Sequence, residues 1–232
     1  MHSKLRFIPI DFLIYIKPSV YNIKTKKRNK KLYFTSKAFY KKGDEMNMDI
    51  IGKIKEDIKQ RCDSPNNFFG IGSYEHIESV AKNAVELAKL YQADVEICEV
   101  AGWLHDIASI TDFQLYENHH IHGANMAEEI LKSFNYPEDK IEAVKLCILN
   151  HRGSVVKEKT TKEEICVADA DAISHYDTLP SLFYLAFVQR KLNIDDGVTF
   201  VKSKLERSYN KMSQESKEYY QVKKDLVLSL LR

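Results

Sequence analysis

Apolar residues recur every three or four positions along most of the chain, which is the spacing of one face of an α-helix. The first such row lies between Ile50 and Ile58. A second row runs from Ile77 to Ala88 and follows Ser73, a candidate N-cap. The pattern predicts an amphipathic helix in each segment.

The middle of the chain gives three further predictions. Residues 95–108 are apolar on nearly every side, which is typical of a continuous helix at the centre of a bundle. Residues 119–134 form another amphipathic row, which ends where Pro137 follows. A further helix is expected from Glu138 to the stretch NHRG, in which Gly153 is a natural terminating residue.

The last third of the chain contains TKEE, residues 161–164, a capping-box pattern that opens the predicted helix EEICVADADAISHY. Further helices are expected near Pro180, Asp195 and Ser216. No credible strand follows Met48. The sequence therefore predicts an all-α fold, a helical bundle.

Length and charge indicate the domain organisation. A chain of 232 residues suits one domain with a core of its own. Residues 1–45 carry 12 Lys or Arg against three acids, and we expect them to form a basic, poorly ordered N-terminal extension before a domain over residues 46–232. Contact with nucleic acid is expected only through this extension. The run DFLIYI is too short and interrupted for a membrane span, so a cytoplasmic protein without a membrane anchor is expected.

The four cysteines show no metal-binding or disulfide pattern. Cys62, Cys98, Cys147 and Cys166 show no CxxC spacing, and three of them lie in apolar segments. We expect buried free thiols and neither disulfides nor a zinc knuckle.

Histidines and acids recur at the ends or inner faces of successive predicted helices. The candidate ligands are His76, His105, Asp106, one of His119, His120 and His122, then His151 and Asp169. Taken singly, each has an ordinary explanation as a helix cap or a buried hydrogen-bonding group. Together, imidazoles and carboxylates suit iron, manganese, zinc or cobalt better than calcium. Since a carboxylate has two oxygens, Asp106 could bridge two ions, so one or two divalent ions are expected.

From about Tyr74 to Tyr176 the sequence resembles the HD-domain metal-dependent phosphohydrolases, an all-helical family with the pattern H…HD…H…H…D. The matching segments are SYEHIESV, AGWLHDIAS, ENHHIHGANMAEEIL, LNHRGS and CVADADAISH. The resemblance implies an HD-type helical domain whose motif core is residues 74–176. Many relatives carry a lysine three residues after the HD aspartate, where this chain has Ser109.

The resemblance also implies a ligand set. His76, His105, Asp106 and Asp169 would form the core metal site, and His119 with His151 would hold a second ion. His119 is selected because it lies four residues before Gly123, and His120 and His122 remain alternatives. Asp169 is preferred to Asp171 because it is the first acid after the small apolar run, which leaves Asp171 as an acid that supports the ligands.

The activity we expect is hydrolysis of a phosphate ester or anhydride of a small metabolite, most plausibly a nucleotide, by metal-activated water. His105 and Asp106 would carry the reaction, and Arg152 is placed to grip phosphate. Lys204, Arg207 and Lys211 could form a basic rim on one helix face, and His175 could act as an acid or simply pack. Tyr74, Tyr176 and Phe183 could stack on a base.

Two alternatives remain open at the level of the sequence. One is an HD-type di-iron oxygenase, which keeps the ligands and changes the chemistry. The other is a non-catalytic module that binds metal or nucleotide. The sequence defines neither the substrate, nor the metal, nor the number of chains in the assembly.

Overall fold

The computed structural model describes residues 42–152 and 158–231, with side chains from Ile50 onward. These residues are helical with no strand among them, so the prediction of an all-α fold is confirmed. The helices are α1 (Lys42–Cys62), α2 (Gly72–Tyr91), α3 (Val95–Leu104), α4 (Ile107–Thr111), η2 (Phe113–Asn118), α5 (His119–Ser133), α6 (Glu138–Asn150), α7 (Lys162–Asp177), α8 (Leu179–Phe183), η3 (Tyr184–Gln189), α9 (Ile194–Lys211) and α10 (Gln214–Leu230).

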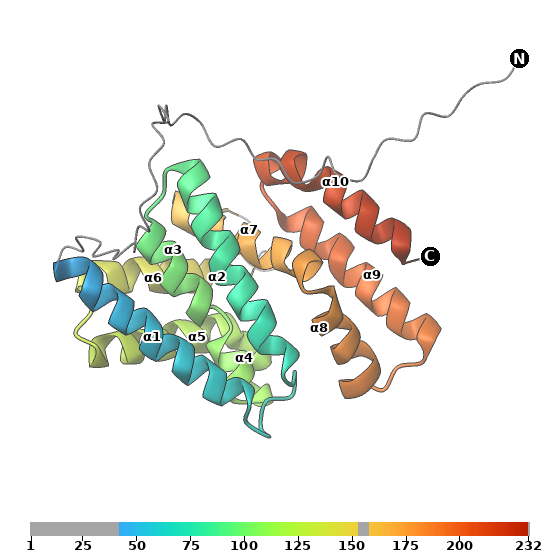
Figure 1. The fold of residues 1–232 in the computed structure, drawn as a ribbon, viewed down its shortest axis with the longest axis horizontal. Coiled ribbons are helices and arrows are strands. Elements are labelled where there is room, and N and C mark those ends of the chain that lie inside the picture. The colour runs from blue at the N-terminus through green and yellow to red at the C-terminus, as the bar shows by residue number, and fades with distance from the viewer. Residues whose placement is uncertain (1–41, 153–157, 232) are drawn as a thin grey trace, which may run out of the picture. The chain divides into compact units, whose positions relative to one another are not determined.

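Helix α7 is the central element of the bundle. It packs on α2, α3 and α6 and also on α9 and α10, so it lies between the earlier and the later helices (Figure 1). All but four of its sixteen residues are buried, which matches a helix surrounded by neighbours. Its N-terminus carries the predicted capping box of Thr161 and Glu164.

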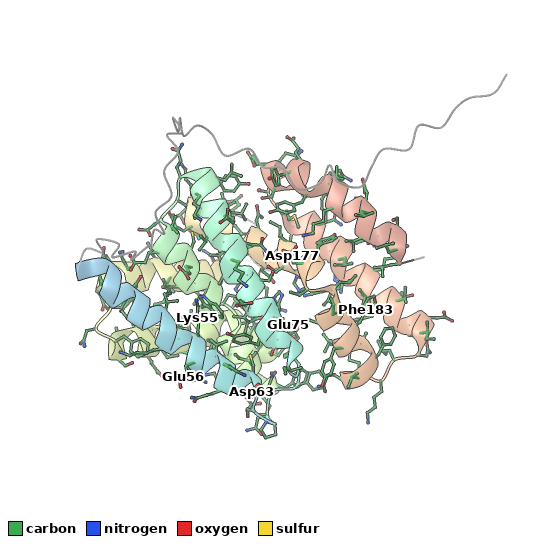
Figure 2. The ribbon with its side chains drawn as sticks, viewed as in Figure 1. Lys55, Glu56, Asp63, Glu75, Asp177 and Phe183 are labelled. Atoms are coloured by element: carbon green, nitrogen blue, oxygen red, sulfur yellow. The ribbon has the colours of Figure 1, made fainter. Side chains whose placement is uncertain are left out.

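The helices α2 and α3 approach each other closely. A Cβ atom on Gly102 would lie 2.7 Å from the Cα atom of Ala81, so only glycine fits at this contact. The side chain of Trp103 is buried beside it and lies near Tyr74, with ring centroids 6.0 Å apart. The charged residues Lys55 and Glu56 belong to α1 and Asp63 directly follows it, whereas Glu75 of α2 and Asp177 of α7 lie toward the C-terminal helices (Figure 2).

Two details of the predicted helices are wrong. The expected continuous helix over residues 95–108 is broken, since Asp106 adopts φ −110° and ψ 17° between α3 and α4. Ser73 does not cap α2, because its hydroxyl donates to the carbonyl of Gly70 and accepts from the amide of Asn67. Gly70, at φ +71°, makes the turn that precedes the helix.

The prediction of buried free cysteines is confirmed, because all four are buried free thiols. No described helix is long and apolar enough to cross a bilayer. The predicted extension covers residues 1–45; helix α1 begins at Lys42, within that range, and residues 1–41 lie outside the described residues.

Candidate metal centre

Two groups of imidazole and carboxylate side chains lie inside the bundle. The first, which we call group A, consists of His76, His105 and Asp171. The second, group B, consists of Asp106, His119 and His151. Within each group the potential ligand atoms all lie within 4.8 Å of one another. A single ion could therefore contact every member of either group.

The backbone fixes which ring nitrogen each histidine presents. The Nδ1 atoms of His105, His119 and His151 lie 2.6–2.8 Å from the carbonyl oxygens of the residues three positions earlier. A carbonyl oxygen only accepts, so each Nδ1 carries the proton and each Nε2 keeps a lone pair. A metal ligand needs this arrangement, in which a hydrogen bond orients the ring through its other nitrogen.

The lone pairs meet no proton donor among the described residues. Nε2 of His105 is buried without a hydrogen-bond partner there. Nε2 of His119 lies 3.2 Å from Nε2 of His151, so two lone pairs face each other. Buried polar atoms are normally paired, and a cation between these nitrogens would satisfy them. The donors thus fit a divalent ion of the first transition row.

Asp106 joins the two groups. Its Oδ2 atom lies 3.6 Å from Nε2 of His105, and its Oδ1 atom lies 3.5 Å from Nε2 of His119. The break between α3 and α4 turns this side chain away from the helix path and into that position. The hydroxyl of Ser109 donates to Oδ1 at 3.1 Å and helps to hold it. One carboxylate oxygen therefore faces each group.

Burial favours the neutral form of His105 and His151, and nearby charge favours the ionised form of Asp106. Burial lowers the pKa of His105 and lowers that of His151 to about 3. Burial alone would raise the pKa of Asp106, but the charges that His105 and His119 take up when protonated favour the carboxylate and bring the pKa below its usual value. Neutral imidazoles and ionised carboxylates are the forms that bind metal.

The two acids of α7 have different surroundings. Asp171 faces group A, since its Oδ1 atom lies 3.3 Å from Nε2 of His76 and its Oδ2 atom 2.5 Å from Nζ of Lys211. Asp169 accepts hydrogen bonds from the backbone amide and the hydroxyl of Ser213, at 3.0 and 2.5 Å. Asp169 is thus hydrogen-bonded to the start of α10, whereas Asp171 lies beside the histidines. The sequence suggests Asp169 for the place beside the histidines.

The three histidines at the start of α5 are also distinguished. His119 belongs to group B, while His122 is exposed and in neither group. His120 is buried beside His119, with ring centroids 5.8 Å apart, and its Nδ1 atom has no partner among the described residues. His175 is buried and donates from Nδ1 to the carbonyl oxygen of Asp171 at 2.8 Å.

A cavity of about 440 Å³ opens over both groups. Besides the ligand candidates, five basic residues line it: Arg152, Arg190, Lys204, Arg207 and Lys211. Arg152 also contacts Glu117, whose carbonyl and carboxylate oxygens accept from its guanidinium. The basic rim expected on one helix face therefore borders the same cavity as the candidate ligands.

The aromatic residues of this cavity are not the expected ones. Tyr176 is buried and donates its hydroxyl to the carbonyl of Leu205, and Tyr74 packs near Trp103. Neither of them, nor Phe183, lines the cavity. Phe69, Tyr116 and Phe200 line it instead, and sequence reasoning missed them. The paired aromatics in PNNFFG were the one available signal for Phe69.

Comparison with known proteins gives matches in sequence and in fold. The family model described as HD domain matches residues 73–176. A Ribonuclease Y of Finegoldia magna is 29% identical over 144 residues, which are 54% of this chain and 26% of that protein. The chain thus spans about a quarter of that relative's length.

Solved structures of Bacillus subtilis YpgQ share the fold. One has a TM-score of 0.61 at 18% identity, and another, in complex with ADP, has a TM-score of 0.58 at 17% identity. Each covers 81% of this chain and 94% of the other. At these identities the likeness is one of fold alone.

Proposed function

We propose that this chain, which belongs to the HD-domain family of metal-dependent phosphohydrolases through residues 73–176, hydrolyses a phosphate ester or anhydride of a small metabolite. The observation that carries the proposal is the carboxylate of Asp106, which has one oxygen toward His105 and the other toward His119. A bridging carboxylate of this kind suits two ions and the phosphate chemistry that such a pair supports.

We propose His76, His105, Asp106 and Asp171 as the ligands of one ion and Asp106, His119 and His151 as those of a second. Iron, manganese, cobalt and zinc all suit these donors. Bound there, the metal would supply a Lewis acid that lowers the pKa of water and polarises a phosphoryl oxygen. Asp169 supports the ligand helix in this proposal, because its contacts are with Ser213.

The chain's own residues would orient the substrate. Arg152 lines the cavity next to His151, and its guanidinium can donate two hydrogen bonds to a phosphate. Lys211 also lines the cavity while its Nζ atom holds Asp171. Positive charge near the phosphate would offset the charge that develops on the phosphoryl oxygens.

A nucleotide is the substrate that the lining supports best. The rings of Phe69 and Tyr116 lie 5.1 Å apart at the cavity, and Tyr116 stacks on His119 at an interplanar angle of 14°. Aromatic rings that line a cavity, as these two do, can stack on a base. The ADP held by one structure of the same fold supports this choice.

The test is hydrolysis of a panel of nucleotides by the full chain with manganese, iron, cobalt or zinc. Asp106→Asn should abolish release of phosphate, and Asp225→Asn, at an exposed position of α10, should not. Equal activity in the Asp106 variant would reject the proposal. Activity that requires oxygen would select the di-iron oxygenase instead, and nucleotide binding without turnover would select the non-catalytic module.

A further inference from the structure

Three of the cavity's basic residues lie on one face of α9, beyond the HD match. Lys204, Arg207 and Lys211 are three and four positions apart, so they line one side of the helix. On α9 the remaining charges after the first turn are Lys202 and Glu206, both exposed and neither lining the cavity. The charged side chains that this part of α9 turns to the cavity are therefore all basic.

These cations differ in how they are compensated. Lys211 is paired with Asp171, Arg152 with Glu117, and Arg190 lies over the ring of Phe200, 4.8 Å from its centroid. Lys204 and Arg207 form no hydrogen bond or ion pair with any described residue. The cavity thus contains two cations that no described residue pairs directly.

Lys204 is half-buried, and its charge is unfavourable there. Burial lowers the pKa of its ammonium to about 8, and the charge of Lys211 acts in the same direction, while Asp171 and Asp106 oppose the shift. The lysine is still mostly protonated at pH 7. Holding a charge away from water without a partner costs free energy, which an anion bound beside it would recover.

We propose that Lys204 and Arg207 form an anion subsite for a second phosphate of the substrate, beside the phosphate held at groups A and B. The inference rests on the proposed function and deepens it, because it makes the substrate a compound with at least two linked phosphates, such as a nucleoside di- or triphosphate. A cavity of about 440 Å³ is within the range of small-molecule sites. Members of groups A and B and the two residues of the subsite line the same cavity.

The first test measures binding without metal, so it does not depend on hydrolysis. Isothermal titration calorimetry would follow tripolyphosphate binding to the full metal-free chain and to Lys204→Ala and Arg207→Ala. Each substitution removes a charge-assisted hydrogen bond and should weaken binding about tenfold or more. The control is Lys202→Ala, an exposed lysine of the same helix, which should bind as the parent does. Circular dichroism would verify that each variant is folded.

Failure of the parent chain to bind tripolyphosphate, or an equal loss in Lys202→Ala, would overturn the subsite. A second test compares kcat/KM for a nucleoside triphosphate and its monophosphate in the metal-loaded chain. Lys204→Ala and Arg207→Ala should lower kcat/KM for the triphosphate about tenfold and kcat/KM for the monophosphate much less. Equal losses for the two substrates would overturn the assignment to a second phosphate. Selective tripolyphosphate binding with no hydrolysis of any nucleotide would refute the proposed function and leave the subsite standing.

Discussion

Group A and group B have similar donors but are built in different ways. Group A takes its members from α2, the residue after α3 and the centre of α7, and Lys211 compensates its acid. Group B consists only of residues at helix ends: Asp106 just before α4, the first residue of α5 and the residue after α6. A helix end leaves backbone carbonyls free, and those of Tyr116 and Ile148 orient the two group B imidazoles.

The difference teaches that the two groups are not independent. Asp106 belongs to group B by its Oδ1 atom, yet its Oδ2 atom faces His105 of group A. Changes at Asp106 should therefore affect both groups, whereas changes at the outer members should affect one.

The first prediction concerns hydrolysis in Asp106→Asn. Loss of a residue that only supports a ligand typically lowers metal affinity or activity about 10–100-fold, so loss of a shared ligand should lower kcat/KM by more than about 100-fold. The measurement is steady-state hydrolysis of the best nucleotide, with Asp225→Asn as the control. A fall of less than tenfold would show that the two groups do not depend on Asp106.

The second prediction is that acid destabilises the metal-free protein. Burial lowers the pKa of His151 to about 3 and also lowers that of His105, whereas an unfolded histidine titrates near 6.5. Below about pH 6.5 the unfolded state therefore binds more protons, and the free energy of unfolding falls as pH falls. The limit is about 1.4 kcal/mol per pH unit for each such histidine.

Urea unfolding between pH 7 and pH 5 measures this slope before the carboxyl groups contribute. His151→Gln should reduce the slope, because it removes one of the buried neutral imidazoles. A free energy of unfolding that is the same across this range would contradict the burial of neutral histidines in the two groups.

The third prediction separates group A from group B through Lys211. Removing one partner of a largely buried ion pair leaves the other uncompensated, so Lys211→Met should lower the free energy of unfolding of the metal-free protein by about 3 kcal/mol. A divalent ion at group A would compensate Asp171 in its place. Manganese should therefore stabilise Lys211→Met more than it stabilises the parent.

The control for this variant is Lys202→Met, at an exposed position of the same helix, where no loss is expected. Urea unfolding without manganese gives the loss in the free energy of unfolding, and the same measurement with manganese gives the stabilisation by the ion. Equal stabilisation of Lys211→Met and the parent by manganese would show that no ion takes the place of the lysine beside Asp171.

The smallest effect is expected at Asp169. Asp169→Asn loses charge-assisted hydrogen bonds to Ser213, which should lower the free energy of unfolding by about 2 kcal/mol and leave the bound metal in place. The matched variant is Asp171→Asn, which should lose the ion of group A. Loss of metal from Asp169→Asn alone would support Asp169 as the ligand, as the sequence predicts.

The sequence predicts most of the helices because their causes are local. The capping box at Thr161 and the apolar rows of α1 and α6 require nothing beyond neighbours along the chain. The break at Asp106 could not be predicted this way, since residues 102–110 are almost uniformly apolar and show no glycine or proline at the break. It arises from how the packed helices hold His105 and Asp106.

The site was predictable in type and less so in detail. The spacing of histidines and acids indicated a metal centre, but the distinction between Asp169 and Asp171 depends on Ser213 and Lys211, more than 35 residues away in sequence. The aromatic lining could not be predicted for the same reason, because Phe69 and Tyr116 meet only in the folded chain. Contacts between distant segments decide such details.

The most direct test of the central claim is the number of metal ions per chain, measured by elemental analysis of the full chain reconstituted with manganese, beside His76→Ala and His119→Ala. We expect two ions in the parent, one in each of these variants, and close to none in Asp106→Ala. Absence of bound metal in the parent, or an unchanged ion count in Asp106→Ala, would contradict two groups joined by one carboxylate.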